Sequence, residues 1–272
     1  MTEDPEPYGK IINGPWVVSR KVEKKENCYF YHTMELPSHG TVFGEWDLRG
    51  KEDQYLGNVS VNAKRVLDVG TASGHMCFWM EKMGADVFAY DLSPYDDWDI
   101  VPYFNNNLAE HVELRRRHLG LINNSFWFAH GILSSKSKVS YGRIYDLPKN
   151  LGQFDVVLVG SILLHLRDPF LALQKVSALV SDVLVVTDVM PGQRSFLSKL
   201  SNKLLFGKKH RQMEFLPNAS TNKPLETWWN LSPELITEFL KVLGFTKINT
   251  SYHQQKGRKN KTKKMFTIIA KR

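Results

Sequence analysis

The residues with the clearest chemical potential form a short turn flanked by two glycines. Gly70 and Gly74 follow the apolar run 66–69 and precede a stretch with a helical pattern that begins at His75. Because glycine has no Cβ atom, the backbone of such a turn can approach a bound ligand closely and adopt dihedral angles that other residues avoid. Several nucleotide-binding folds share a glycine-rich turn, so this feature alone predicts only a nucleotide-like ligand.

Two aspartates make the prediction more specific. Asp91 ends the next predicted strand, about 20 residues after the turn, where a carboxylate can accept hydrogen bonds from both hydroxyls of a ribose. Asp68 ends the strand before the turn, where its carboxylate can lie near a ligand's ammonium group. The alternative is that Asp91 and residues 92–94 only cap a turn. Taken together, the glycines and both aspartates favour ligand binding.

These residues need a sheet that brings several strand ends to one edge. Short apolar runs predict strands at residues 65–69, 86–91, 125–129, 154–159 and 183–188. Helical spacing predicts helices at 75–83, 107–120, 169–180 and 233–243. The last segments, 245–252 and 264–270, have the pattern of a β-hairpin. Strands that alternate with helices and end in a hairpin predict a mostly parallel sheet with one antiparallel strand.

The chain divides into two unequal parts. Residues 1–62 are aromatic and polar without clean periodicity, and we interpret them as an N-terminal extension packed on the core, with a short helix near 51–56. Residues 63–272 form the predicted ligand-binding domain, which contains a lid or cap insertion at 190–230. Apolar residues of the insertion fall at helical spacing among lysines: Phe196, Leu197, Leu200, Leu204 and Leu205. A solvated helix packed on the sheet is the alternative to a lid.

The turn and its aspartates resemble the cofactor site of class I S-adenosylmethionine (SAM)-dependent methyltransferases. Residues 68–74 are similar to the first motif of that family, and Asp91 to its ribose-binding acid. Residues 145–148 and 154–158 resemble its adenine-side loop and fourth strand. Across 64–272, the resemblance implies an α/β, Rossmann-like doubly wound fold, with a mostly parallel seven-stranded sheet and an antiparallel C-terminal strand.

The same resemblance implies SAM as the cofactor. Its expected binding residues are Asp68, Gly70, Thr71, Ala72, Gly74, Asp91, Leu92, Ile144 and Ser161, with Arg143 also near the adenine edge. Ala72 stands where the family most often has glycine, and alanine is small enough for binding to survive. The Gly-x-Gly-x-x-Gly spacing of dinucleotide-binding oxidoreductases is absent.

Residues 160–169 carry a more specific resemblance within this superfamily. With Leu147-Pro148 and residues 228–232, they resemble the carboxymethyltransferases of tRNA wobble uridine. In that family a tyrosine precedes the matching histidine and helps hold the extra carboxylate of carboxy-SAM. Here Leu164 occupies that position and offers no hydrogen bond. This departure from the family pattern therefore favours plain SAM as the methyl donor.

His165 is the candidate catalytic base. Methyl transfer is an in-line displacement, so the protein must mainly align the nucleophile and exclude water. His165 follows the 154–159 strand, at the edge where open α/β sheets bind ligands, and imidazole titrates near neutral pH. The alternative is a histidine that only packs or bonds a backbone carbonyl. Trp46, Trp98 and Trp229 are candidate acceptor-binding residues, or else pack the extension and cap on the core.

Composition restricts the remaining possibilities. A hydrophobic content of 42%, no apolar run of about 18–20 residues and no secretory signal predict a soluble, cytoplasmic protein without a membrane span. Cys28 and Cys77 lack the spacing of metal ligands, so no metal site is expected. The net charge of +8 suits an anionic partner, and the lysine-rich loop 256–264 could contact RNA phosphates or simply be solvated.

These observations leave three functions open. The first is a SAM-dependent methyltransferase that moves a methyl group to an oxygen or nitrogen atom of a small or medium-sized acceptor. The second is an RNA (tRNA)-modifying methyltransferase that uses the basic loop. The third is a SAM-binding regulator without catalysis.

Overall fold

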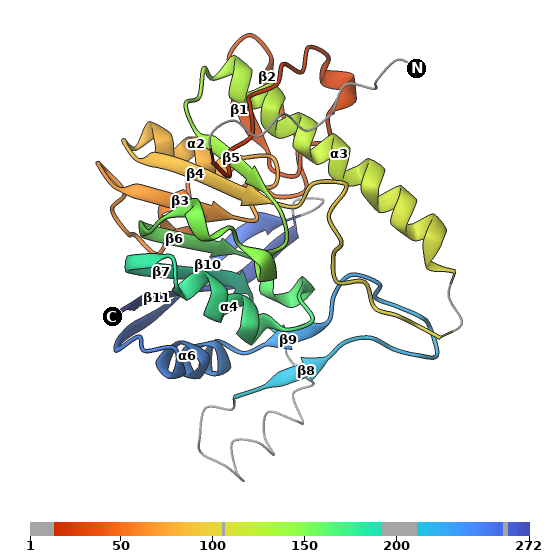
Figure 1. Cartoon of the computed structure of the whole chain (residues 1–272), viewed down its shortest axis with the longest axis vertical. Coiled ribbons are helices and arrows are strands. Elements are labelled where there is room, and N and C mark those ends of the chain that lie inside the picture. The colour runs from red at the N-terminus through yellow and green to blue at the C-terminus, as the bar shows by residue number, and fades with distance from the viewer. Residues whose placement is uncertain (1–13, 105–106, 192–210, 258–260) are drawn as a thin grey trace.

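A seven-stranded sheet organises the computed structural model, which describes residues 14–104, 107–191, 211–257 and 261–272 (Figure 1). The strands are β3 (Arg65–Val69), β4 (Asp86–Asp91), β5 (Lys138–Tyr141), β6 (Phe154–Gly160), β7 (Val180–Val189), β10 (Lys247–Gly257) and β11 (Lys261–Lys271). Their order is β10-β11-β7-β6-β3-β4-β5, and β11 is antiparallel to the other six strands. The predicted mostly parallel sheet with an antiparallel C-terminal strand is confirmed.

The direction in which strands are added reverses between β3 and β6. From β3 the chain proceeds outward to β4 and β5, and then returns to β6 on the other side of β3. The loops that leave the carboxyl ends of β3 and β6 therefore diverge, which opens a crevice where ligands bind in sheets of this type. Strand order thus places the glycine turn after β3 beside the segment that follows β6.

Both faces of the sheet are covered, so its central strands are mostly apolar. Val66 and Leu67, adjacent in β3, pack into separate core clusters. The cluster around Val66 includes residues of α2 (His75–Lys82), α3 (Leu108–Ile132) and the N-terminal segment. The cluster around Leu67 includes α4 (Pro169–Ser177) and α6 (Pro233–Val242). Burial on both sides explains why β6 is a continuous apolar run instead of an alternating one.

The helices that cover the sheet begin where their sequences predict. In α4 and α6 the cap side chains, Asp168 and Ser232, accept hydrogen bonds from backbone N–H groups three residues later. Proline follows each cap, where its missing N–H costs nothing. The residues after α2 and α6 include Gly84 and Gly244, both with positive φ, which end these helices in the left-handed conformation.

The strand predicted at 125–129 is wrong. These residues belong to α3, which continues to Ile132 instead of ending near Gly120, and the third parallel strand is β5 at Lys138–Tyr141. Phe126, Trp127 and Phe128 are all buried there. A short apolar run buried on several sides of a helix resembles a buried strand in sequence, because neither shows a clear polar period.

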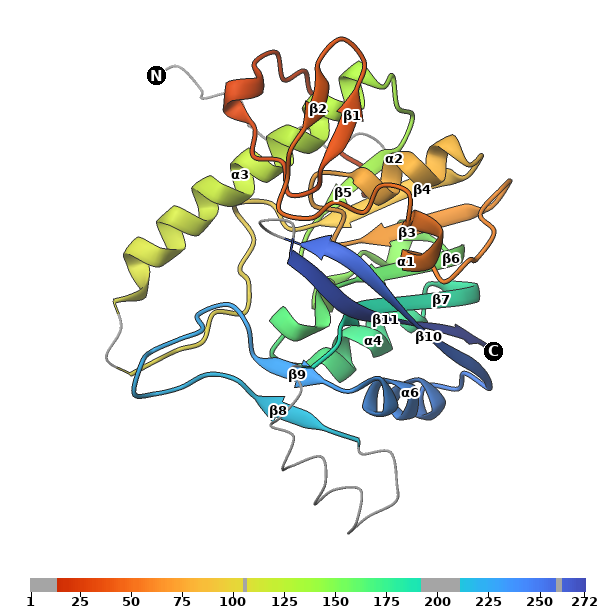
Figure 2. The ribbon, with the colours of Figure 1, turned by 180° about the vertical axis from the view of Figure 1, so that it is seen from behind.

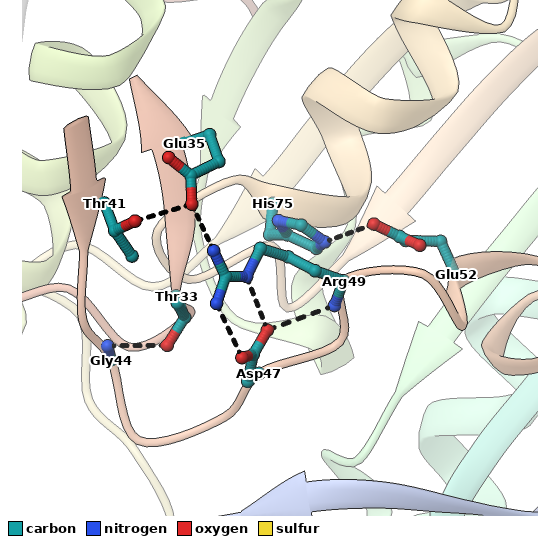
Figure 3. A network of polar contacts seen from close by, with 8 residues as sticks. All are labelled: Thr33, Glu35, Thr41, Gly44, Asp47, Arg49, Glu52 and His75. Atoms are coloured by element: carbon teal, nitrogen blue, oxygen red, sulfur yellow. Dashed lines mark hydrogen bonds and ion pairs between the residues drawn. The ribbon is translucent and has the colours of Figure 1, made fainter.

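The N-terminal segment packs on the core through apolar and polar contacts (Figure 3). It contains the hairpin β1 (Met34–Leu36) and β2 (Gly40–Val42), and α1 (Glu52–Tyr55), which confirms the short helix predicted near 51–56. Arg49 donates to both carboxylate oxygens of Asp47 at 2.8 Å and also pairs with Glu35. The buried contact between Glu52 and His75, 3.1 Å from Oε1 to Nε2, joins this segment to α2. The domain boundary at 62/63 stays a prediction.

The insertion after β7 is described only in part. Its predicted amphipathic helix lies almost entirely within residues 192–210, outside the described residues. The part that follows contains β8 (Met213–Phe215) and β9 (Trp229–Leu231), which pair with each other apart from the main sheet (Figure 2). The predicted basic loop 256–264 is mostly strand: residues 256–257 belong to β10 and 261–264 to β11, and residues 258–260 between them are also outside the description. None of the described helices is long and apolar enough to cross a membrane.

Candidate active site

The turn after β3 adopts the positive φ angles that its glycines predict. Gly70 has a φ of +81°, and its N–H donates to the carbonyl of Tyr90 at 2.8 Å. A Cβ atom on Gly70 would lie 2.5 Å from Cγ2 of Ile162, so only glycine lets the turn pass under the segment that follows β6. Ala72 also has a positive φ, +48°, which costs an L-residue about 1 kcal/mol. Both residues line a cavity at the carboxyl ends of the strands.

Gly74 has a different role from the other glycine of the turn. It is not among the residues that line the cavity, and it lies at the N-cap of α2 with a φ of +88°. A Cβ atom there would lie 2.5 Å from the ring of Phe78 and 2.7 Å from that of Phe126. Gly74 therefore lets α2 begin in contact with two buried aromatic rings, and this packing fixes the position of the turn.

Asp91 lies at the end of β4 and faces the turn. One of its carboxylate oxygens accepts from the N–H of Ala72 at 2.6 Å, and the other from that of Leu92 at 2.7 Å. Burial raises the pKa of Asp91 to about 6, although these two N–H groups oppose the shift. The two bonds fix the direction of the carboxylate, and each oxygen keeps a further lone pair for a hydroxyl. Asp91 and Leu92 both line the cavity.

Asp68 is a buried carboxylate with unused hydrogen-bonding capacity. Burial raises its pKa to about 7; the hydroxyl of Thr71 opposes this shift and the charge of Asp91 adds to it. Oδ2 of Asp68 and Oγ1 of Thr71 complete no hydrogen bond with any described residue, and both side chains line the cavity. Because such buried atoms cost free energy when unpaired, they mark a place where a donor from a ligand would be accommodated.

Another part of the cavity wall is formed by the segments that follow β5 and β6. Arg143 and the buried Ile144 lie in the loop after β5. Ser161, directly after β6, has a φ of +53° and donates its N–H to the carbonyl of Thr187 at 2.7 Å. Its hydroxyl lies 3.4 Å from that of Tyr55 in α1. Arg143, Ile144 and Ser161 all line the cavity, as the sequence predicts for the cofactor side.

The N-terminal segment supplies part of the wall that sequence reasoning did not identify. Tyr31, His32 and Tyr55 line the cavity together with the predicted Trp46. The backbone N–H of His32 donates to Oγ of Ser73 in the glycine turn at 2.9 Å. Burial, with the nearby His75 adding to the effect, lowers the pKa of His32 to about 3, so its ring is neutral. The abundance of aromatic residues was the only sequence signal for this wall.

His165 lies on the cavity wall in a single turn of 3-10 helix after β6. Its Nδ1 is 2.6 Å from the backbone carbonyl of Glu226. A carbonyl oxygen can only accept, so Nδ1 carries the hydrogen and Nε2 of the neutral ring has a free lone pair. Burial lowers the pKa of His165, Arg115 contributes in the same direction, and the Glu226 carbonyl opposes them. The ring is therefore neutral near pH 7, the form that a base requires.

The three predicted tryptophans have different surroundings. Trp46 and Trp98 line the cavity, and the indole N–H of Trp98 has no hydrogen-bond partner among the described residues. Trp229 is not among the lining residues. Its indole N–H donates to the carbonyl of Arg167 at 3.2 Å, and its ring lies 5.3 Å from that of Phe215. For Trp229, the alternative that the ring packs against other parts of the protein therefore describes its surroundings.

Four further charged residues line the cavity: Asp97, Asp99, Arg115 and Glu226. Asp97 and Asp99 flank Trp98 in a stretch that the sequence predicts at the acceptor pocket, whereas Arg115 and Glu226 come from segments that it did not single out. Asp99 already accepts from the backbone N–H of Arg167 and from the hydroxyl of Tyr145. Arg115 belongs to α3, and Glu226 to the loop before β9. Within the described part of the chain, no three histidine, cysteine or acidic side chains are grouped so that they could hold a metal ion.

Three solved structures with a similar fold are methyltransferases or were determined with the product of the methyl donor. The N-terminal domain of EvdMO1, in the presence of S-adenosylhomocysteine (SAH) and D-fucose, has a TM-score of 0.53 at 16% identity, covering 91% of this chain and 94% of that one. A SAM-dependent methyltransferase from Methanosarcina mazei has a TM-score of 0.51 at 16% identity, with 83% and 98% covered. The 1,6-didemethyltoxoflavin-N1-methyltransferase of Burkholderia thailandensis has 0.50 at 15% identity, with 83% and 77% covered.

At these identities the structural similarity shows a shared fold. A direct comparison with proteins of curated function gives no match. A family model described as a methyltransferase domain matches residues 47–248, which is more than half of the chain and contains the turn, both aspartates and His165. The chain therefore belongs to this methyltransferase-domain family.

Proposed function

We propose that the protein is a SAM-dependent methyltransferase that acts on an oxygen or nitrogen atom of a small or medium-sized acceptor. The observation that carries this proposal is the shared cavity of the turn at Gly70, the oriented carboxylate of Asp91 and the unpaired carboxylate of Asp68. Together they offer backbone room, an acceptor for ribose hydroxyls and a partner for an ammonium group. Few ligands other than an aminoacyl nucleoside would use all three.

The residues present fit the ribose, the ammonium group and the adenine ring of SAM. Asp91 would accept from the ribose hydroxyls, and Asp68 from the ammonium group of the methionine part, which would satisfy its orphaned Oδ2. Ile144, buried in the loop after β5, would contact the adenine. When bound, SAM supplies a methyl carbon made electrophilic by the attached sulfonium. The protein itself needs only to bind, orient and desolvate the acceptor.

His165 would remove the proton of the acceptor as its nucleophilic atom attacks. The hydrogen bond from Nδ1 to the Glu226 carbonyl holds the tautomer whose Nε2 can take that proton. Trp46 and Trp98, on the same cavity wall, would shed water from a planar acceptor. These roles are proposed for an acceptor whose hydroxyl or nitrogen is protonated before reaction, because an acceptor with a free lone pair needs no base.

The cofactor assignment is tested with matched glycine variants. Gly70→Ala and Gly244→Ala both place alanine at a positive φ, but only the first forces a Cβ atom against a neighbour, in the cavity. Calorimetric titration with SAH should show at least tenfold weaker binding to Gly70→Ala and unchanged binding to Gly244→Ala. Asp91→Ala should also weaken binding at least tenfold. Unchanged SAH affinity in both Gly70→Ala and Asp91→Ala would refute the assignment.

The alternatives are separated by the fate of the methyl group. Incubation with SAM labelled in the methyl group, in a cell extract, distinguishes a catalyst from a regulator that only binds SAM. RNase treatment then distinguishes an RNA acceptor, whose label becomes digestible. We favour a small acceptor because one of the compared structures was determined in the presence of D-fucose and another with bound 1,6-didemethyltoxoflavin. The finer resemblance to the wobble-uridine group has no support in these comparisons, and Leu164 weakens it further.

A further inference from the structure

One face of α3 runs from the interior of the cavity to its polar wall. Ile122, Leu119 and Arg115 line the cavity at spacings of three and four residues, which place them on the same side of a helix. Ile122 and Leu119 are buried, whereas the Arg115 side chain retains 29% of its exposure. His111 lies one further turn toward the N-terminus on this face. The helix thus brings a partly exposed guanidinium to a site that otherwise consists largely of apolar and acidic groups.

Within the described structure, Arg115 makes an ion pair with Glu226, but its Nε completes no hydrogen bond. Its Nε lies 3.4 Å from Oε2 of Glu226, and the other oxygen of that carboxylate is 2.9 Å from Nε2 of His111. Neither terminal amino group of Arg115 makes a hydrogen bond with a described residue. The planar edge that binds carboxylates and phosphates through two parallel hydrogen bonds is therefore available.

Glu226 connects this free edge to the candidate base. Its carboxylate holds Arg115 and His111, and its backbone carbonyl accepts from Nδ1 of His165. Arg115 is also close enough to His165 and Asp91 to lower the pKa of both. An acceptor held by Arg115 would thus have its reacting atom within a short molecular length of His165.

Of the described residues, Arg115 and Arg143 are the two arginines that line the cavity, and Arg143 lies next to Ile144, on the side proposed for the adenine. Asp91 is bonded to two backbone N–H groups, and Asp99 to Arg167 and Tyr145. Glu226 is shared by Arg115 and His111, and Asp97 is exposed at the solvent side. Both bonds of Asp99 fall on Oδ2, so its other oxygen has no partner among the described residues. An anionic acceptor would meet the unused terminal donors of Arg115.

We propose that the methyl acceptor carries an oxyanion, as a carboxylate or a phosphate ester, and that Arg115 is the residue that selects it. The proposal rests on the proposed methyltransferase function. Glu226 holds the Nε edge, the terminal edge binds the oxyanion, and the aromatic walls of Trp46 and Trp98 accommodate the body of the acceptor. Replacing arginine by lysine keeps the charge but removes the paired geometry, so the lysine variant should retain only part of the preference.

The experiment compares three probes that share a phenol and differ in charge: 4-hydroxybenzoate, 4-hydroxyphenyl phosphate and 4-hydroxybenzamide. Each is titrated by calorimetry into protein saturated with SAH. The native protein should bind one of the anions at least tenfold more tightly than the neutral amide, and which anion binds better identifies the source of the oxyanion. In Arg115→Gln this preference should fall below twofold. Arg116→Gln, an exposed change of equal charge on the same helix, should keep it.

Two control measurements show whether a change in probe binding reflects the loss of the Arg115 side chain alone. Thermal unfolding of both variants shows whether Arg115→Gln is folded, and Arg115→Lys replaces it if it is not. SAH affinity is measured in parallel: absence of SAH binding to the native protein refutes the proposed function, whereas intact SAH binding isolates the oxyanion question. The inference is overturned if the native protein does not prefer an anion, or if no probe binds with a Kd below 10 mM. It is also overturned if the preference survives in Arg115→Gln. A loss of SAH affinity of more than threefold in that variant would overturn it too, because it would assign Arg115 to the cofactor.

Discussion

Replacing Asp68 by asparagine should stabilise the free protein above pH 7 and weaken its binding of SAH. The carboxylate of Asp68 is buried at 4% exposure, and its Oδ2 has no partner among the described residues. The free protein therefore holds a carboxyl group in surroundings that disfavour its charge. Asparagine has the same shape without the charge, so it removes this cost but also removes the partner of an ammonium group.

The magnitude follows from the difference in pKa between the folded and unfolded states. Burial raises the pKa of Asp68 from 3.8 to about 7, so the folded state holds the proton more tightly than the unfolded state. The contribution of this group to stability is fully present below pH 4 and is lost as the pH rises to 7. A shift of about 3 units corresponds to about 4 kcal/mol at pH 8. Asp68→Asn should recover about 2–4 kcal/mol of this, since an unpaired amide retains some desolvation cost.

The assay is urea unfolding of the native protein and the variant at pH 5 and pH 8, combined with SAH calorimetry at pH 8. Asp188→Asn is the matched control, because burial also raises the pKa of Asp188 to about 7 but this residue does not line the cavity. Both variants should gain stability at pH 8 relative to pH 5. Only Asp68→Asn should lose SAH affinity, by at least tenfold. If the stability of Asp68→Asn and of the native protein depended equally on pH, the fold would not raise the pKa of the Asp68 carboxyl group.

Three further changes test other parts of the site. Gly74→Ala should destabilise the fold by about 2 kcal/mol or more, measured by urea unfolding, because its Cβ atom meets the ring of Phe78 at a positive φ. Ala72→Gly should alter stability by less than about 1 kcal/mol, since relief of the left-handed strain offsets the greater freedom of the unfolded chain; a larger loss would argue that the methyl group packs. His165→Gln should lower kcat about 10²-fold or more. In the native enzyme kcat should fall as the pH drops through the lowered pKa of His165, and that dependence should be absent in the variant; a retained acid limb would exclude His165 as the base.

Most of the central sheet could be predicted from short-range pattern. β3 and β4 have the predicted bounds, and β6, β7, α4 and α6 begin or end within a few residues of them. Buried parallel strands are mostly apolar, and several of the helices carry proline or glycine at their ends, so these elements have a local signal. The strand predicted at 125–129 failed because its only signal was an apolar run, which a buried helix such as α3 also produces.

That the residues proposed for the cofactor would meet at one edge of the sheet was predictable for the same local reason. Gly70, Ala72 and Asp91 lie at the ends of strands, and the order of strands in a parallel sheet brings those ends to one edge. The acceptor side was not. Arg115 is one of three consecutive arginines on a long helix, and Glu226 lies in a loop with no regular pattern. Nothing in their immediate neighbours distinguishes these two residues from solvated charges.

By itself, then, the sequence determined the strand–turn–helix geometry at Gly70, the acid at Asp91 and the apolar layers of the sheet, because each depends on interactions between residues close in the chain. The tertiary structure decided which side chains share the cavity. It placed Tyr31 and His32 beside the turn, and joined Arg115 to His165 through Glu226. These contacts link segments separated by tens of residues or more, and only packing of the whole chain fixes such distances.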